Sequence, residues 1–439
     1  MCGIAEVLIN LGYNVTGSDI VENDNVKRLK KLGARVYIGH SKENLNSPHV
    51  VVASSAIGKD NIEVATAEKK RIPVIPRAEM LAELMRLKYA LCVAGTHGKT
   101  TTTSMIGLVL SRAKKDPTIV VGGRLKNLDS NVKLGNGEFI VAEADESDGS
   151  FMHYSPSISI VTNIDDDHLD YYGTKKKLKD TFVKFLNKVP FYGFSVLCGD
   201  DKDIRDITER LRRPYVTYGL NRENDYRAVD ITLKPGYSGY TVLKGQKKIG
   251  DIEVANTGLH NVINSLGACV TGLEMGIEFD TIRKGLELYR GVGRRLELVG
   301  NLGDVVFYDD YAHHPTEIKL ALKSLRHIYP KRKIVVMFQP HRYTRTRDLY
   351  KDFPESFKNA DRVFISPIYP AGEKPIKGVN SNLIVKEFEN QDKIRFCTSV
   401  KKIFQEVKNE LNGNEVCLTL GAGDICQINN RITELTKNT

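Results

Sequence analysis

The chain has 439 residues, about three times the usual length of a single domain, so two or three domains are expected. Its 41% of hydrophobic and 27% of charged residues exclude an intrinsically disordered chain. The net charge of +10 comes from basic residues that are spread along polar helix faces without interleaved aromatic residues. This favours phosphate-rich small molecules or plain solvent as their partners, and not nucleic acid or a membrane surface.

The seven cysteines are widely spaced and include no C-x-x-C pair, which indicates a reducing compartment. No apolar run approaches the roughly 20 residues that are needed to cross a bilayer. The first residues include Glu6 and lack the basic start of a signal peptide. We therefore expect a cytoplasmic protein with no membrane partner.

Residues 1–86 alternate short apolar runs with helical segments, which predicts a Rossmann-like parallel α/β domain. In such a domain a buried strand and a glycine-rich turn normally precede the first helix and hold a diphosphate. Here the chain opens inside the helix pattern, so we expect that the first strand is missing and that nucleotide-sugar binding is weak. The strands within 13–19 and 49–57 should then expose unpaired edges. Asp19, at the end of the earlier strand, is either a ribose contact or a turn former.

Two further α/β units follow, at 87–292 and 293–439. In the second unit we expect strands at 88–95, 138–145, 157–164 and 194–199. In the third unit we expect strands at 304–311, 333–340, 362–368 and 415–424. Helical patterns separate them, so both units are open α/β sheets.

The segment GTHGKT at 95–100 lies between a buried strand and a helix. Backbone N–H groups and the positive end of the helix face an anion in this setting. We therefore predict a phosphate loop for ATP in which Lys99 contacts the β and γ phosphates and the Thr100 hydroxyl binds Mg²⁺. Val93 stands where the common motif has its first glycine. A turn that only caps the helix is the alternative.

Two acidic clusters, EADESD at 143–148 and DDDH at 165–168, follow strands whose carboxyl ends should lie beside this loop. Hard oxygen ligands suit Mg²⁺, whereas an imidazole is a less usual ligand for it. Each cluster alone fits a solvated helix start equally well. Together with the loop they favour a metal site.

Further polar segments open helices at 258–264, 309–317 and 339–347. Amide side chains in GLHNVIN could contact an adenine edge or simply cap a helix. Arg294 and Arg295 could reach a γ phosphate. DDYAHHPTE and QPHRYTRTR both follow strands and should converge on one crevice, where Arg342 and Arg345 could hold a carboxylate. A solvated arginine-rich turn is the alternative.

These motifs, with NIDDDHLDYYG, GVGRRLE and GAGD, resemble the Mur ligases in order and spacing over essentially the whole chain, and most of all the alanine-adding members. The resemblance implies three domains: a Rossmann-like UDP-sugar-binding domain at 1–86, truncated at its start, a central ATPase domain at 87–292 and a Rossmann-like amino-acid-binding domain at 293–439. It implies ATP-dependent ligation of L-alanine to UDP-N-acetylmuramate, through an acyl phosphate, in peptidoglycan precursor synthesis. A monomer or weak homo-oligomer is expected.

The resemblance also assigns roles to individual residues. ATP is expected to contact the loop residues Gly95, Thr96, His97, Gly98, Lys99, Thr100 and Thr101, the adenine-side residues His260, Asn261 and Asn264, and also Arg295 and Asp310. The expected metal ligands are Thr100, Glu143 and His168. The expected amino-acid pocket consists of Tyr311, Arg342 and Arg345, and the expected UDP-sugar contacts are His40, Ser54 and Ser55. Lys99, His168 and His313 are the expected catalytic residues, with His313 as the base for the alanine amine.

Three other functions are weighed against this one. A ligase that attaches a recycled tripeptide to the same sugar nucleotide would need a wider pocket than the HRYTRTR segment indicates. A regulatory P-loop ATPase would not make ADP in proportion to an amide product. A nicotinamide dehydrogenase is disfavoured because its glycine fingerprint is absent while an ATP loop is present.

Overall fold

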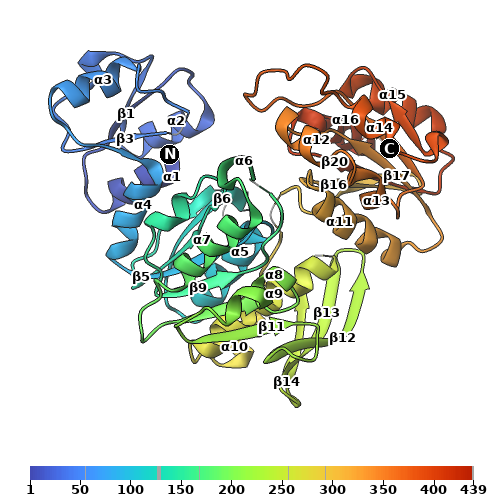
Figure 1. Ribbon diagram of the computed structural model, residues 1–439, viewed down its shortest axis with the longest axis horizontal. Coiled ribbons are helices and arrows are strands. Elements are labelled where there is room, and N and C mark those ends of the chain that lie inside the picture. The colour runs from blue at the N-terminus through green and yellow to red at the C-terminus, as the bar shows by residue number, and fades with distance from the viewer. Residues whose placement is uncertain (55, 126–129, 168, 256, 292, 438–439) are drawn as a thin grey trace. The chain divides into compact units, whose positions relative to one another are not determined.

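The computed structural model describes residues 1–54, 56–125, 130–167, 169–255, 257–291 and 293–437 (Figure 1). The chain divides into two compact units, and each contains two separate segments. The first unit comprises Met1–Arg227 and Gly267–Gly285, and the second comprises Ala228–Leu266 and Leu286–Thr439. Both units are α/β, as the sequence predicts. Among the helices in the described ranges, none is long and apolar enough to span a membrane.

The first 86 residues alternate helices with short parallel strands. The helices are α1 (Cys2–Asn10), α2 (Asp24–Lys31), α3 (Ile62–Lys69) and α4 (Arg77–Arg86), and the strands are β1 (Thr16–Asp19), β2 (Arg35–Ile38), β3 (Val51–Ala53) and β4 (Val74–Pro76). Strand β1 pairs with β2, and β3 pairs with β4, as two separate two-stranded parallel sheets. Within the described residues, no third strand joins either sheet. The predicted alternation of strands and helices is therefore present.

The rest of the first unit is built on a mostly parallel sheet in the order β11-β10-β9-β5-β8-β6-β7. Its strands are β5 (Tyr89–Ala94), β6 (Thr118–Leu125), β7 (Ser130–Lys133), β8 (Phe139–Glu143), β9 (Ile158–Val161), β10 (Phe194–Cys198) and β11 (Tyr215–Gly219), and its helices include α5 (Lys99–Arg112), α6 (Leu169–Tyr172), α7 (Lys175–Leu186), α8 (Lys202–Thr208) and α10 (Phe279–Leu286). Strand β5 is central and buried from its second residue onward. The loop that follows β5 therefore starts from a rigid position at the carboxyl edge of the sheet.

Strand β12 (Tyr226–Lys234) begins beside β11 and continues into the second unit, where β13 (Tyr237–Lys244) and β14 (Lys247–Val254) form an antiparallel hairpin. Helix α9 (Leu259–Glu274) follows the hairpin. These three strands are not predicted from the sequence, although the turn residues Gly236 and Gly245, both with positive φ, lie between them.

The carboxyl-terminal part of the second unit is a six-stranded sheet in the order β15-β16-β20-β17-β18-β19. The strands are β15 (Glu297–Leu302), β16 (Val305–Asp310), β17 (Lys333–Phe338), β18 (Arg362–Ile365), β19 (Ile394–Phe396) and β20 (Glu415–Leu420). One face packs on α11 (Pro315–Ile328), α13 (Phe353–Ser356) and α14 (Asn382–Lys386), and the other on α15 (Val400–Glu410) and α16 (Gln427–Lys437). Helix α12 (Tyr343–Leu349) follows the loop after β17. The four predicted strands are confirmed, while β15 and β19 were not predicted.

Candidate active site

The loop between β5 and α5 has the geometry of an anion cradle. Gly95 and Gly98 have φ values of +124° and +83°, which a residue with a side chain rarely adopts. A Cβ atom at Gly95 would lie 2.3 Å from Oγ1 of Thr162, so the close packing also requires glycine there. Gly98 is the N-cap of α5 and offers no side chain to cap its N–H groups. The first turn of this 14-residue helix can therefore donate to a phosphate, with Thr100 and the buried Thr101 in that turn.

Lys99 is held by a buried carboxylate. Its Nζ atom donates to the carbonyl oxygens of Gly95 (2.7 Å) and Thr96 (3.3 Å) and to both carboxylate oxygens of Glu146 (2.8 Å each). The side chain of Glu146 is only 1% exposed. Burial opposes the charged form of Lys99, but nearby carboxylates, with Glu146 foremost, outweigh it and raise the lysine pKa. Lys99 is therefore a cation, and an incoming phosphate competes with Glu146 for it.

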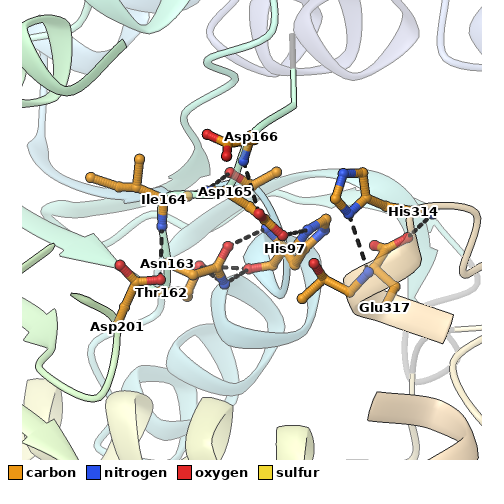
Figure 2. Close-up of polar contacts among 12 residues, drawn as sticks. His97, Thr162, Asn163, Ile164, Asp165, Asp166, Asp201, His314 and Glu317 are labelled. Atoms are coloured by element: carbon orange, nitrogen blue, oxygen red, sulfur yellow. Dashed lines mark hydrogen bonds and ion pairs between the residues drawn. The ribbon is translucent and has the colours of Figure 1, made fainter. Parts of the chain in front are cut away.

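Two of the three predicted metal ligands, Glu143 and Thr100, lie in described elements. Glu143 is the last residue of β8 and is the register partner of Val93 in β5, so its side chain starts close to the phosphate loop. Thr100 lies in the first turn of α5. His168 lies outside the described residues. Asp165, from the second acidic cluster, places Oδ2 3.2 Å from Nε2 of His97 in the loop (Figure 2). Oxygen donors of the kind that Mg²⁺ prefers thus start from the edge of the sheet that carries the loop.

The predicted adenine-side residues lie at the start of α9, in the second unit. Nδ1 of His260 and Oδ1 of Asn261 are buried polar atoms with no hydrogen-bond partner among the described residues. Burial lowers the pKa of His260 to about 4, with Arg295 acting in the same direction, so the ring is neutral at pH 7. Asn264 is buried one turn further along. Unpaired buried donors and acceptors are what a purine edge would satisfy.

Arg294 and Arg295 differ in their contacts. Arg294 Nε binds Oδ2 of Asp309 at 3.0 Å, and its guanidinium also donates to the carbonyl of Gly421, so this residue ties the loop after β20 to β16. Arg295 forms an ion pair with Glu317 at 3.6 Å. Both guanidinium groups lie over the ring of Tyr311, at 5.1 Å and 5.3 Å from its centroid. The two arginines thus share the ring of Tyr311 and differ in the carboxylate that each contacts, Asp309 for Arg294 and Glu317 for Arg295.

Asp310 is buried and accepts hydrogen bonds from two backbone N–H groups of neighbouring segments. Its two carboxylate oxygens accept from the N–H groups of Leu296 and Ala312, each at 2.7 Å. Burial raises the pKa of Asp310 to about 6, although Arg295 acts against the shift. The predicted ribose contact would have to use the remaining lone pairs of this carboxylate.

His313 and His314 precede α11. Glu317 accepts from the N–H groups of His313 (3.1 Å) and His314 (3.3 Å) and completes a capping box with His314 (Figure 2). His313 Nδ1 lies 3.0 Å from the carbonyl of Tyr311, so Nδ1 carries the proton and Nε2 remains an acceptor. Burial lowers the pKa of His313 to about 3, even though Glu317 opposes this, so the ring is neutral at pH 7.

The loops after β16 and β17 meet, as the sequence predicts. The ring of His313 lies 5.3 Å from that of His341, and His341 stacks on Tyr369 at 5.7 Å. Arg345 Nη1 approaches Nδ1 of His341 at 3.3 Å. Arg342 has φ +70°, unusual for a residue with a side chain, and its Nε is buried without a hydrogen-bond partner in the described part of the chain. A strained arginine with a buried free donor fits a carboxylate ligand.

The predicted UDP-sugar residues divide between described and undescribed positions. Ser18 Oγ donates to Oε2 of Glu63 at 2.6 Å and lies 3.0 Å from Nδ1 of His40. Oε1 of Glu63 accepts from the N–H of Ser41 (3.1 Å) and from Nδ2 of Asn44 (2.7 Å). Ser54 accepts from the N–H of Ala56 at 3.4 Å, and Ser55 lies outside the described residues. Glu63 thus organises the segment that contains His40.

Sequence reasoning missed the roles of Glu63, Glu146 and Asn163. Glu146 lies inside the acidic segment that the sequence analysis singled out, but nothing in the spacing shows that it pairs with Lys99. Asn163, inside the predicted strand-end segment, contacts His97 (Figure 2). Glu63 carries no sequence signal beyond its place in the first turn of a helix after Asn61.

Three family models match the chain along its length: the Mur ligase family catalytic domain at residues 1–89, the Mur ligase middle domain at 93–272 and the Mur ligase glutamate ligase domain at 294–423. The chain is 50% identical over 430 residues to the UDP-N-acetylmuramate–L-alanine ligase of Desulfatibacillum aliphaticivorans, covering 98% of this chain and 94% of the relative. It is 49% identical over 426 residues to the same-named enzyme of Endomicrobium trichonymphae, covering 97% and 94%.

Solved structures that resemble the chain include the UDP-N-acetylmuramate–alanine ligase of Thermotoga maritima. Its TM-score is 0.81 at 28% identity, and the match covers all of this chain and 96% of that one. A murein peptide ligase from Psychrobacter arcticus matches with a TM-score of 0.69 at 22% identity, covering 100% and 96%. This second likeness concerns the fold alone.

Proposed function

The chain belongs to the Mur ligase family, and on that premise we propose that it joins L-alanine to the carboxylate of UDP-N-acetylmuramate with ATP, giving UDP-N-acetylmuramoyl-L-alanine, ADP and phosphate. The observation that carries the proposal is the near full-length identity of about one half with relatives of that name. The phosphate loop with its charged lysine and the arginine loop after β17 support it. The place of action would be the cytoplasm, in peptidoglycan precursor synthesis.

We propose three working parts. Residues 1–86 would hold the UDP sugar through His40 and Ser54, residues 87–292 would bind ATP, and residues 293–439 would bring the amino acid. The nucleotide phosphates would lie on the loop from Gly95 to Thr101. The adenine would contact the start of α9, where buried polar atoms have no protein partner in the described chain.

The first chemical step would be transfer of the γ phosphoryl group to the substrate carboxylate. A carboxylate is a poor acyl donor, and phosphorylation gives it a leaving group. Lys99 would neutralise the charge that develops on the transferred group, and Arg295 would add a second cation. Residues Thr100 and Glu143 are hard oxygen donors that fit Mg²⁺, with His168 as a further proposed ligand. When bound, Mg²⁺ would polarise the phosphate oxygens.

In the second step the alanine amine would attack the acyl phosphate, and phosphate would leave from the tetrahedral adduct. Arg342 and Arg345 would hold the alanine carboxylate beside Tyr311. Nε2 of His313 is the proposed acceptor for the amine proton, because Nδ1 is engaged with the carbonyl of Tyr311. Burial lowers the pKa of His313, so the ring is neutral at pH 7 and Nε2 is able to accept that proton.

The test is phosphate release measured with ATP, UDP-N-acetylmuramate and L-alanine, with each substrate omitted in turn. Release should require all three substrates and match amide formation. Lys99→Ala should raise the activation free energy by at least about 3 kcal/mol, which lowers turnover by more than 100-fold. This is the scale of losing a charged contact to the transferred group. Turnover near the wild-type rate would refute the assignment of the loop. A preference for a tripeptide over L-alanine would identify a different Mur ligase activity.

A further inference from the structure

The phosphate loop is held from outside by the segment that follows β9. We propose that Thr162 and Asn163 form a clamp on the peptide of His97 and so position the loop for the nucleotide phosphates. The inference rests on the proposed function only in taking the loop to bind a nucleoside polyphosphate. Both residues are positioning residues, since neither is placed in contact with substrate.

Asn163 binds both sides of one loop residue. Its Oδ1 accepts from the N–H of His97 at 2.9 Å, and its Nδ2 donates to the carbonyl of His97, also at 2.9 Å (Figure 2). A primary amide that satisfies the donor and acceptor of one residue replaces the two bonds of a strand partner. The side chain therefore fixes the orientation of His97 within the loop.

Thr162 contacts the same peptide group of the loop. Its hydroxyl donates to the carbonyl of His97 at 2.5 Å and also accepts from Nδ2 of Asn163 at 3.2 Å. Thr162 is 3% exposed, and its Oγ1 is the atom that a Cβ at Gly95 would meet at 2.3 Å. The carbonyl of His97 thus has two donors from one strand end, and the start of the loop packs directly on one of them.

The clamp is itself fixed. The N–H of Ile164 donates to Oδ2 of Asp201 at 3.3 Å, and Asp201 is the N-cap of α8 (Figure 2). The N–H of Asp165 donates to the hydroxyl of Thr96 at 2.9 Å, and the N–H of Thr96 donates to the carbonyl of Asn163 at 3.3 Å. The contacts run in both directions, so the strand end and the loop form one hydrogen-bonded unit.

The flexibility of the loop makes such a clamp useful. His97 stands next to Gly98 and two residues after Gly95, and both glycines have positive φ. Glycine has the largest conformational freedom of any residue. Without the clamp, the loop would lose much conformational entropy on binding phosphate, and this loss opposes binding. A loop that is already ordered avoids this entropic cost, which strengthens the binding of ligand groups that contact the loop. The clamp should therefore affect the affinity for nucleotide phosphates and leave other substrates unaffected.

The experiment compares Thr162→Val, which keeps the shape of the side chain and removes its donor, with Thr162→Ser, which keeps the hydroxyl. Asn163→Leu removes both amide contacts. Ser159→Ala is the matched control: Ser159 is buried in β9, just before the clamp, and shares a 2.8 Å hydrogen bond with Ser195 of β10. Calorimetry measures ADP binding, steady-state kinetics give KM for each substrate, and thermal unfolding reports stability.

We expect Asn163→Leu and Thr162→Val to weaken ADP binding and raise KM for ATP by about 10-fold or more, the effect of losing one or two buried hydrogen bonds. KM for L-alanine and for the UDP sugar should stay within about 2-fold, and Thr162→Ser should restore most of the affinity. The double variant should lose less than the two single effects combined, because both side chains hold the same carbonyl.

Several results would overturn the clamp. One is ADP affinity that is unchanged in Asn163→Leu and Thr162→Val. Another is an equal loss for all three substrates, or a loss that Ser159→Ala reproduces in proportion to its lower stability, since either would show a merely structural role. Failure of the proposed function looks different: wild-type protein would bind ADP tightly without alanine-dependent phosphate release, and the variants would still weaken ADP binding if the clamp exists.

Discussion

At the scale of single residues, Lys99 and Glu146 form a pair that a nucleotide must disturb. The ammonium group has three N–H donors, and in this structure the carboxylate of Glu146 and two loop carbonyls share them. A phosphate that recruits Lys99 therefore replaces at least one charged hydrogen bond. Glu146 is anchored behind the lysine, since its own carbonyl accepts from the hydroxyl of Tyr172 at 2.5 Å.

We predict that Glu146→Gln tightens ADP binding by roughly 5-fold. A neutral amide gives Lys99 a hydrogen bond worth about 1 kcal/mol less than a charged one, so the lysine is released more easily. Calorimetric titration of both proteins provides the measurement, and Glu138→Gln, at an exposed position just before β8, is the control. Weaker ADP binding in Glu146→Gln would instead show that the carboxylate guides Lys99 toward the phosphates.

The arginines after β17 lead to a second prediction. Arg342 has a strained backbone and a buried Nε without a hydrogen-bond partner among the described residues. Arg345 contacts His341 through Nη1, which lies 3.3 Å from Nδ1 of that ring. Arg345→Ala and Arg342→Lys should each raise KM for alanine by at least about 10-fold, since a lysine cannot present the planar fork that binds a carboxylate. KM for ATP should change far less. Equal effects on the two substrates would mean that these arginines face the nucleotide.

Residue contacts were predictable only where they are local in sequence. GTHGKT predicts a loop, a helix start and a lysine because all of these depend on neighbouring residues. The pairing of Lys99 with Glu146 spans 47 positions and that of His97 with Asn163 spans 66, and neither spacing is encoded in a local pattern. Such contacts arise because parallel strands bring their carboxyl ends to one edge of a sheet. The sequence therefore predicts the edge without showing which side chains pair there.

At the scale of elements, the strands that were easiest to predict from the sequence are buried and largely apolar, such as β5, β9, β17 and β20. The missed strands are mostly half exposed. Strand β14 begins with two exposed lysines, and β12 alternates half-buried and exposed residues along its second half. These strands gain their stability from pairing with neighbours rather than from an apolar run, which a scan for hydrophobic segments does not detect.

Glu63 joins three elements and supports a third prediction. It lies in α3 and binds Ser18 in β1 as well as Ser41 and Asn44 after β2. If His40 contacts the UDP sugar, Glu63→Ala should weaken binding of that sugar nucleotide by about 10-fold, because one to two hydrogen bonds that orient the segment are lost. ADP affinity should be unchanged. Glu68→Ala, on the exposed face of α3, is the control, and an equal effect in both variants would contradict a specific role.

At the scale of the whole molecule, buried ionisable groups couple stability to pH. Burial lowers the pKa of His260 to about 4 and that of His313 to about 3, whereas each titrates near 6.5 when unfolded. Between these pKa values the unfolded chain binds protons at positions where the folded chain does not. The free energy of unfolding therefore falls as pH drops below 6.5. Asp310 acts in the opposite direction. Its pKa is raised to about 6 from 3.8, so the folded chain gains a proton, and some stability, as pH falls through 6.

The two histidines outweigh the one aspartate, so acidification should destabilise the protein. Between pH 7 and pH 5 we expect a net loss of about 1–2 kcal/mol, after allowance for the partial exposure of the rings to solvent. His313→Gln, which cannot titrate, should show a loss smaller by about 1 kcal/mol over the same interval. Chemical unfolding at a series of pH values measures this, and His327→Gln, which replaces a histidine in the last turn of α11, is the control. Parallel pH profiles for the wild type and His313→Gln would show that the ring of His313 is protonated equally in the folded and unfolded chains. The lowering of the His313 pKa by burial would then be wrong.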